Sequence, residues 1–381
     1  MDGGGFRHLK RRRDAERHGS EPPPRARDRS MLRAMPVAVL APFAFPAVRG
    51  NAVTVQRIVA GLRARDVAVS LWDLSSTSEA AVAAEVERAR PVLIHAFHAL
   101  RAGPLALRLA RRLEVPLVVT LTGTDANHEL LDAVNAPHVR RVLEGAAVVT
   151  AFDASIVEQV AGILPDLRAR LVVVPQSVRV DGPVPFDLGA AWPLPAERVL
   201  FAFAGGIRPV KAPLAPLPAF DRVVAADPRV RLLYAGPVLD RREGEALTSA
   251  LARRPWARHI GPVPHVAMPA LLAQADVVLN CSISEGGMAN SVLEAMAVGR
   301  AVLVSDVPGN RTLVEHDVTG LRYATEGELE AAALRLARDA GLRARLGASA
   351  RARVDREFPP SREIDGYLAT YRRLVPTVTI A

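Results

Sequence analysis

The feature that most constrains the fold is a strand-and-helix pattern that runs through the chain twice. From about Pro36 onward, short apolar runs without polar alternation are each followed by a turn and an amphipathic stretch. In the first half the apolar runs lie at 37–40, 92–94, 117–119, 147–149 and 171–174. Strands of this composition are typical of a parallel sheet that helices cover on both faces. We therefore expect a doubly wound α/β domain over residues 35–180.

The same pattern restarts after a linker, predicted at 181–197, that is rich in proline and glycine. Further apolar runs lie at 200–203, 231–235, 275–279 and 301–304. They predict a second doubly wound domain over 198–360, followed by a C-terminal helical segment, 361–381, that crosses back to the first domain. Two such domains joined by one linker predict a cleft between the carboxyl edges of two facing sheets.

The net charge of +9 is unevenly distributed and excludes some classes of partner. Residues 1–33 hold ten Arg or Lys against five acids, so they supply about half of the net charge. Three consecutive prolines near this run favour a disordered basic leader over 1–34, with a membrane-surface or nucleic-acid tag as the alternative. The remaining chain is only mildly basic, and we expect no nucleic acid as partner.

Membrane and disulfide signals are absent from the sequence. No stretch reaches the roughly 20 apolar residues that cross a bilayer, although peripheral membrane contact through basic patches stays open. The single cysteine, Cys281, gives no disulfide framework, and its place beside a buried strand favours packing over nucleophilic chemistry. A cytoplasmic location is the expectation that follows.

The segment 282–296 is the strongest candidate for a ligand-binding site. A strand is expected to end at Ser284, a glycine pair follows Glu285, and a helix then begins. Free N–H groups at such a helix start suit a diphosphate or sugar oxygens. Ser291 and Glu294 equally fit a capping box, in which the glutamate returns to the helix start. The residues alone leave both interpretations open.

A second segment with chemical character follows the apolar run 200–203. Arg208 and Lys211 lie there, and Lys211 is one of only two lysines among 49 basic residues. An arginine fork and a compact lysine charge would together neutralise a diphosphate leaving group. A solvated loop is the alternative, but the isolation of Lys211 in an arginine-rich chain favours a functional role.

Two turns of the first domain are predicted to reach the cleft. Gly50 and Asn51 form a strand-to-helix turn, while Thr124 and Asp125 follow the apolar run 117–119. Asn51 and Asp125 could each cap a helix or meet a sugar hydroxyl.

Two histidines, His95 and His98, follow the apolar run 92–94. A structural role is the more common one for a histidine, but they lie at the kind of strand end where α/β proteins place their sites. The sequence lacks the motifs of several other kinds of active site. There is no metal-ligand cluster with convincing spacing, no Gly-x-Ser-x-Gly elbow and no phosphate-binding loop of the Gly-x-x-x-x-Gly-Lys type.

Taken together, these segments resemble the retaining glycosyltransferase family 4, also called glycosyl transferases group 1, and within it the glycosyltransferase 1 domain-containing proteins. The resemblance runs from about Ala41 to Tyr323. It rests on the order and spacing of the segments 50–54, 122–127, 206–211, 280–286, 293–296, 308–310 and 318–321.

The resemblance implies a GT-B fold, in which two Rossmann-like domains face a central cleft, with the nucleotide on the C-terminal domain and the acceptor on the N-terminal one. It implies that the diphosphate is clamped by Arg208 and Lys211, and the ribose by Glu294. The donor-binding residues that it implies are Gly50, Asn51, Arg208, Lys211, Glu285, Gly286, Gly287, Met288, Ala289, Asn290 and Glu294. On the acceptor side it implies His98, Thr124 and Asp125, and in catalysis His98, Glu285, Arg208 and Lys211. It implies neither a metal nor another cofactor.

Two departures from the family pattern bear on these roles. Eight residues separate Glu285 from Glu294, where members of the family usually have seven. Either a bulge restores the register or Gly286 takes the place of the first glutamate. Phe97 interrupts the His-x-His pair that many members carry, which leaves His98 as the predicted acceptor-side histidine.

The expected function is transfer of a sugar from a nucleoside diphosphate donor, with UDP-sugar as the expected donor, to an unidentified hydroxyl acceptor with retention of configuration. No protein nucleophile is obvious, so we expect a front-face substitution assisted by the leaving phosphate. One alternative is a selenosugar- or thiosugar-forming transferase of the same fold. Another is a non-catalytic sugar-nucleotide-binding protein, which the altered glutamate spacing suggests. A nucleic-acid-binding module would rest on the leader alone.

Overall fold

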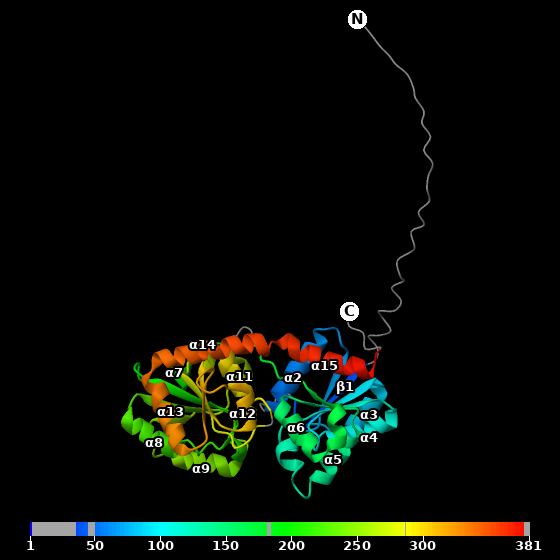
Figure 1. Cartoon of the computed structure of the whole chain (residues 1–381), viewed down its shortest axis with the longest axis horizontal. Coiled ribbons are helices and arrows are strands. Elements are labelled where there is room, and N and C mark those ends of the chain that lie inside the picture. The colour runs from blue at the N-terminus through cyan, green and yellow to red at the C-terminus, as the bar shows by residue number, and fades with distance from the viewer. Residues whose placement is uncertain (2–35, 45–49, 181–183, 286, 377–381) are drawn as a thin grey trace.

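A computed structural model describes residues 1, 36–44, 50–180, 184–285 and 287–376. The predicted leader, part of the predicted linker and Gly286 lie outside the described residues. Figure 1 shows two lobes side by side, each built on a sheet with helices around it. Both sheets have six strands, and every strand pairing is parallel.

The first domain is built on a sheet with the strand order β2-β1-β3-β4-β5-β6. Its strands are β1 (Val37–Ala41), β2 (Val69–Asp73), β3 (Leu93–Phe97), β4 (Leu117–Thr120), β5 (Val148–Ala151) and β6 (Leu171–Val173). Its helices are α2 (Gly50–Arg63), α3 (Glu79–Ala89), α4 (Gly103–Leu113), α5 (Ala136–Gly145) and α6 (Ala154–Ile163), with the short helices η2 (Asp125–Glu129) and η3 (Pro165–Arg170). All residues of β1, β3, β4 and β5 are buried, as expected when helices cover both faces.

The second domain has the strand order β12-β11-β10-β7-β8-β9. Its strands are β7 (Val199–Ala204), β8 (Val230–Ala235), β9 (Ala257–His259), β10 (Val277–Asn280), β11 (Ala301–Ser305) and β12 (Leu321–Tyr323). Its helical elements are α7 (Leu188–Ala191), η4 (Pro209–Lys211), α8 (Leu217–Ala226), α9 (Arg241–Leu251), η5 (His265–Ala267), α10 (Met268–Leu272), α11 (Asn290–Ala297), α12 (Pro308–Leu313), α13 (Glu326–Arg338) and α14 (Ala340–Glu357).

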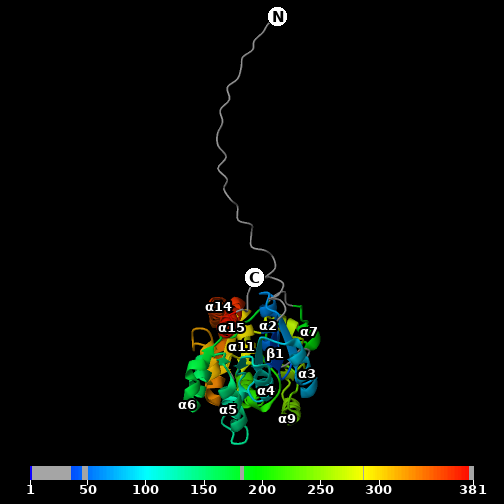
Figure 2. The same cartoon turned by 90° about the vertical axis from the view of Figure 1, so that its right-hand side faces the viewer.

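The last helix, α15 (Pro360–Leu374), packs on the first domain although it follows the second in sequence. Figure 2 shows it beside α2. Its apolar face, with Ile364, Tyr367 and Tyr371, is buried in the same core cluster as strand β1 and helix α2. A buried ion pair joins the two helices, because Arg57 of α2 donates through Nε and Nη2 to the Glu363 carboxylate at 2.8 and 2.9 Å.

The strand expected to end at Ser284 is shorter than predicted, because β10 ends at Asn280. The chain then turns, and the N–H of Ile283 binds the carbonyl oxygen of Val210 at 3.0 Å. This contact brings the segments 208–211 and 282–285 together at one edge of the second sheet. Within the described residues, none of the helices combines the length and the apolar character needed to cross a bilayer.

Candidate functional site

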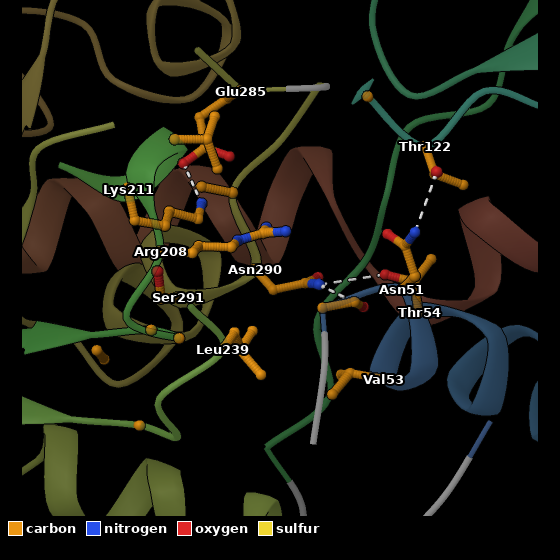
Figure 3. A pocket seen from close by; sticks show the side chains of 18 of the residues that line it. Asn51, Val53, Thr54, Thr122, Arg208, Lys211, Leu239, Glu285, Asn290 and Ser291 are labelled. Atoms are coloured by element: carbon orange, nitrogen blue, oxygen red, sulfur yellow. Dashed lines mark hydrogen bonds and ion pairs between the residues drawn. The ribbon is translucent and has the colours of Figure 1, made fainter. Parts of the chain in front are cut away.

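A cavity lies between the two domains, where the carboxyl ends of strands from both sheets meet (Figure 3). Eleven of the residues predicted from the sequence line it: Gly50, Asn51, His98, Thr124, Arg208, Lys211, Glu285, Met288, Ala289, Asn290 and Glu294. Gly287 and Asp125 are not among the lining residues, and Gly286 lies outside the described part of the chain. Residues almost 250 positions apart in the sequence thus share one site.

Arg208 and Lys211 form the cationic part of the second-domain wall. Figure 3 shows both side chains reaching from the loop after β7 into the cavity. The Lys211 ammonium donates to Oε1 of Glu285 at 2.5 Å, in a pair whose side chains are 17% and 9% exposed. Lys211 is therefore held in place by a carboxylate, not left in a solvated loop.

The Glu285 carboxylate is held by three donors. Besides Lys211, the amide of Asn280 donates to its Oε1 at 3.0 Å and the hydroxyl of Ser282 donates at 2.6 Å. Burial alone would raise the pKa of Glu285, but the Lys211 charge and these hydrogen bonds outweigh burial and hold it below its usual value. Glu285 is thus an ionised, positioned group of the cavity wall.

Helix α11 begins at Asn290, and its N-cap, Ala289, makes no side-chain capping bond. The capping box considered for Ser291 and Glu294 is therefore wrong, because the helix begins before Ser291. Glu294 is instead bonded from outside the helix, since Nε2 of His265 lies 2.9 Å from its Oε1. His265 also lines the cavity, and sequence reasoning missed it.

Gly287 has a steric function in the structure. Its φ of 126° lies in a region that residues with a Cβ rarely adopt, and an added Cβ would come within 2.9 Å of Phe152 Cβ. The glycine therefore permits the loop before α11 to lie against the first domain. This close approach was not part of the donor-binding role expected for Gly287.

Asn290 links the two domains. Its Nδ2 donates to the carbonyl oxygen of Gly50 at 3.2 Å and to the Thr54 hydroxyl at 3.1 Å (Figure 3), and its Oδ1 accepts from Nη1 of Arg57 at 3.4 Å. The loop before α11 is thereby tied to α2.

Two further contacts from η2 reach the same loop, and neither was predicted. The Asn127 amide donates to the carbonyl oxygen of Glu285 at 2.7 Å, and Nε2 of His128 lies 2.7 Å from the Ser284 hydroxyl. Both pairs are more than 150 residues apart in sequence, so no local pattern reveals them.

Asn51 lies inside α2, which already begins at Gly50, so the N-cap interpretation of Asn51 is wrong. Its amide donates to the Thr122 hydroxyl at 3.2 Å, beyond the carboxyl ends of strands β1 and β4. The amide therefore joins two turns of the first-domain wall.

Asp125 lies beneath this wall and is fully buried. Its carboxylate accepts N–H groups from Ala99 at 2.9 Å, Thr122 at 3.0 Å, Gly123 at 2.8 Å and Ala126 at 3.1 Å. Those bonds hold the turns after β3 and β4 together. Asp125 thus positions the turns below the cavity surface, and its predicted contact with the acceptor stays a prediction.

His98 is buried at the end of β3 with a left-handed φ of 81°. Its Nδ1 accepts the N–H of Arg101 at 3.3 Å. Since a backbone N–H can only donate, the proton of the neutral ring lies on Nε2, 3.0 Å from the Thr124 hydroxyl. Glu129, which the sequence did not single out, has Oε2 at 3.7 Å from the same nitrogen. Burial raises the pKa of Glu129 above its usual value.

His95, in contrast, is structural. It lies within β3, with Nδ1 at 2.6 Å from the Tyr371 hydroxyl and Nε2 at 2.7 Å from the Thr120 hydroxyl. Burial lowers its pKa to about 3, so the ring is neutral. Cys281 is also buried, and burial raises the pKa of its thiol to about 12, as a packing role requires.

Within the described residues, no three His, Cys, Asp or Glu side chains are arranged to hold a metal ion. Independence from metal stays a prediction.

Comparison with solved structures defines the fold. Anabaena HepE in complex with UDP-glucose superposes with a TM-score of 0.72 at 15% identity, covering 88% of this chain and 100% of that one. Sucrose-phosphate synthase from Thermosynechococcus elongatus gives a TM-score of 0.73 at 19% identity, covering 90% and 99%. These similarities, with the two facing parallel sheets, show the GT-B fold.

Comparison of sequences defines the family. The family model for glycosyl transferases group 1 matches residues 198–339. The chain is 27% identical over 259 residues to glycosyltransferase 1 domain-containing protein 1 of Xenopus tropicalis, covering 66% of this chain and 75% of that one. It is 30% identical over 358 residues to a D-inositol 3-phosphate glycosyltransferase of Mycobacterium bovis, covering 84% and 72%. The chain therefore belongs to the glycosyl transferases group 1 family and is a glycosyltransferase.

Proposed function

We propose that this glycosyltransferase moves a sugar from a nucleoside diphosphate donor, with UDP as the nucleotide, to a hydroxyl acceptor with retention of configuration. The observation that carries the proposal is the convergence of Arg208, Lys211 and the first turn of α11 on one cavity. Two cations and the free N–H groups of a helix start suit a diphosphate.

The nucleoside end of the donor is assigned to Glu294. Its carboxylate lies on the cavity wall, where it can accept hydrogen bonds from two ribose hydroxyls while His265 holds its Oε1. The choice of UDP is supported by the structural similarity to HepE, which was solved with UDP-glucose, with UDP and glucose, and with UDP.

In the proposed reaction, the bond between the anomeric carbon and the UDP oxygen breaks while the acceptor oxygen attaches to the same face. The acceptor proton passes to the departing phosphate. Arg208 and Lys211 stabilise the negative charge that develops on UDP. Among the described residues, the carboxylates that line the cavity are Glu285 and Glu294, and each is already paired, with Lys211 and His265 respectively. This pairing disfavours a covalent glycosyl-enzyme and supports a front-face substitution.

His98 is assigned a place on the acceptor side. Because its Nδ1 already accepts the Arg101 N–H, the neutral ring offers a proton and not a lone pair toward Thr124. We infer that His98 acts on the acceptor side by donating its Nε2 proton to Thr124, whose hydroxyl it thereby orients toward the acceptor, and that it is not the general base.

The proposal is tested with a panel of UDP-, GDP- and ADP-sugars. Thermal denaturation identifies the nucleotide that stabilises the fold, since a ligand that binds only the folded state raises the Tm. The matching sugar nucleotide is then offered with a panel of hydroxyl acceptors and with selenophosphate, and the product is examined by ¹H NMR. An α-linked product from an α-linked donor supports retention, whereas a β-linked one contradicts it. Transfer to selenophosphate, without transfer to any hydroxyl compound, would contradict the proposed hydroxyl acceptor and favour a selenosugar-forming transferase.

A further inference from the structure

We propose that the first-domain wall of the cavity binds an anionic group of the acceptor, a phosphate or a carboxylate, on the guanidinium of Arg101. The inference rests on the proposed function, because it takes the second-domain wall, with Arg208 and Lys211, as the place of the donor diphosphate. It names the chemical class of the acceptor that the same site accepts.

Charge is unevenly distributed over the two walls of the cavity. The acidic side chains among its described lining residues, Glu285 and Glu294, both belong to the second domain and both have basic partners. On the first-domain wall, Arg101 is the charged lining residue that the structure describes, apart from the titratable His98. As far as the structure describes it, this wall is therefore positive and presents no carboxylate to the cavity.

The Arg101 side chain lies beside an aromatic ring. It is exposed in the turn between β3 and α4, and within the described residues its guanidinium makes neither an ion pair nor a hydrogen bond. Its Cζ lies 5.9 Å from the centroid of the Phe43 ring, which also lines the cavity. A contact with a ring face restrains the guanidinium without using any of its five N–H donors. The guanidinium is thus held in position, and its N–H donors are available to bind an oxyanion.

Glu129, the acid whose pKa the Arg101 charge lowers, does not occupy the Arg101 guanidinium. Glu129 is directed at His98, with its Oε2 at 3.7 Å from Nε2, and it forms no ion pair with Arg101. Arg101 only lowers the pKa of Glu129 through its field, against the larger opposite effect of burial. An acceptor anion would therefore not have to displace an internal partner.

The hydroxyl groups of Thr122 and Thr124 also lie on the first-domain wall. The Thr124 hydroxyl accepts from Nε2 of His98, and the Thr122 hydroxyl accepts from Asn51, so each has its own hydrogen left to donate. Both threonines line the cavity with Arg101. Hydroxyl donors beside a guanidinium fork suit a phosphate or carboxylate better than a neutral sugar face.

The test uses the full chain saturated with UDP, so that the donor cations are already occupied. Inorganic phosphate and, in a second series, acetate are titrated at constant ionic strength, and binding is followed by calorimetry. We expect saturable binding of at least one anion to the wild-type protein, weakened about fivefold or more in Arg101→Gln. The preferred anion tells a phosphate-bearing acceptor from a carboxylate-bearing one.

Two further variants sharpen the test. Arg140→Gln is the matched control, because Arg140 is exposed on α5, outside the cavity, and should bind the anion like wild type. Phe43→Leu removes the ring beside the guanidinium and should weaken anion binding about twofold to threefold. Equal affinity in wild type and Arg101→Gln, or no saturable anion binding by the UDP-loaded wild type, overturns the inference.

The UDP titration that precedes each anion series separates this inference from the proposed function. Arg101→Gln should bind UDP as tightly as wild type, which also shows that the variant is folded. UDP binding without anion binding defeats only the Arg101 assignment, whereas failure to bind UDP defeats the proposed function itself.

Discussion

The side-chain amide of Asn290 donates a hydrogen bond to the hydroxyl of Thr54 at 3.1 Å, and this contact joins the start of α11 in the second domain to α2 in the first (Figure 3). The same amide also binds Gly50 and accepts from Arg57. The loop that precedes α11 therefore takes its position from both domains. Formation of the donor site is therefore expected to depend on this contact between the domains, to which Asn127 and His128 also contribute.

Replacing Asn290 by alanine should weaken UDP binding about fivefold, which corresponds to the roughly 1 kcal/mol that a hydrogen-bonded link of this kind contributes. Calorimetric titration measures the affinity. Asn135→Ala is the control, since Asn135 binds Asp132 on the surface of the first domain. An unchanged UDP affinity in Asn290→Ala would show that the link between the domains does not support the donor site.

The buried pair between Arg57 and Glu363 should be important for stability, because it fastens α15 to the first domain. Their side chains are 13% and 0% exposed, and Ser177 donates a third hydrogen bond to the carboxylate. Glu363→Ala leaves a buried guanidinium without its partner and should cost about 3 kcal/mol of unfolding free energy, measured in urea.

The neighbouring surface pair between Arg65 and Asp365 provides the control for that measurement. Its side chains are 42% and 57% exposed, so Asp365→Asn should cost less than about 1 kcal/mol. Similar losses of unfolding free energy in Glu363→Ala and Asp365→Asn would mean that burial does not increase the contribution of the Arg57–Glu363 pair to stability.

Much of the fold could be predicted from the sequence, because fully apolar runs mark the central strands of both sheets. The strands that were missed, β2, β9 and β12, are edge strands, and two of them have only three residues. Their burial is partial, so they lack the continuous apolar run that identifies a central strand.

The sequence indicated residue types for the site but not their partners, and the roles of those residues stay predictions. Arg208, Lys211 and Glu294 line the cavity as expected, but His265 was not predicted because it reaches Glu294 from 29 residues away. Likewise, the sequence left open whether His95 is structural or part of the site. The ring is covered by Tyr371, which lies 276 residues later, and no local pattern reveals that contact.

The buried neutral state of His95 makes a prediction about pH. Its pKa of about 3 lies below the usual value of 6.5, so between these values the unfolded chain binds a proton that the folded chain does not. The contribution of His95 to stability is therefore complete above pH 6.5 and declines as the pH falls. From pH 7 to pH 5, wild type should lose about 2 kcal/mol more unfolding free energy than His95→Gln. Parallel urea denaturation curves at both pH values measure the difference, and identical losses would refute the assignment.

Activity is expected to persist without metal ions, since Arg208 and Lys211 supply the positive charge beside the departing diphosphate. After dialysis against EDTA, release of UDP from the donor sugar should remain within about twofold of the untreated rate. Added Mg²⁺ or Mn²⁺ should not raise it. A rate that collapses in EDTA and returns with one metal ion would instead require a cation at the diphosphate.

The central claim is that the cavity between the domains binds a nucleoside diphosphate through Arg208 and Lys211. The most direct measurement is a calorimetric titration of UDP into wild type, Arg208→Gln, Lys211→Gln and the surface control Arg140→Gln. Each cavity variant should lose about tenfold or more in affinity, since each removes a charge-assisted contact, and Arg140→Gln should match wild type. UDP binding that is unaffected by both cavity variants, or absent from wild type, would contradict the account.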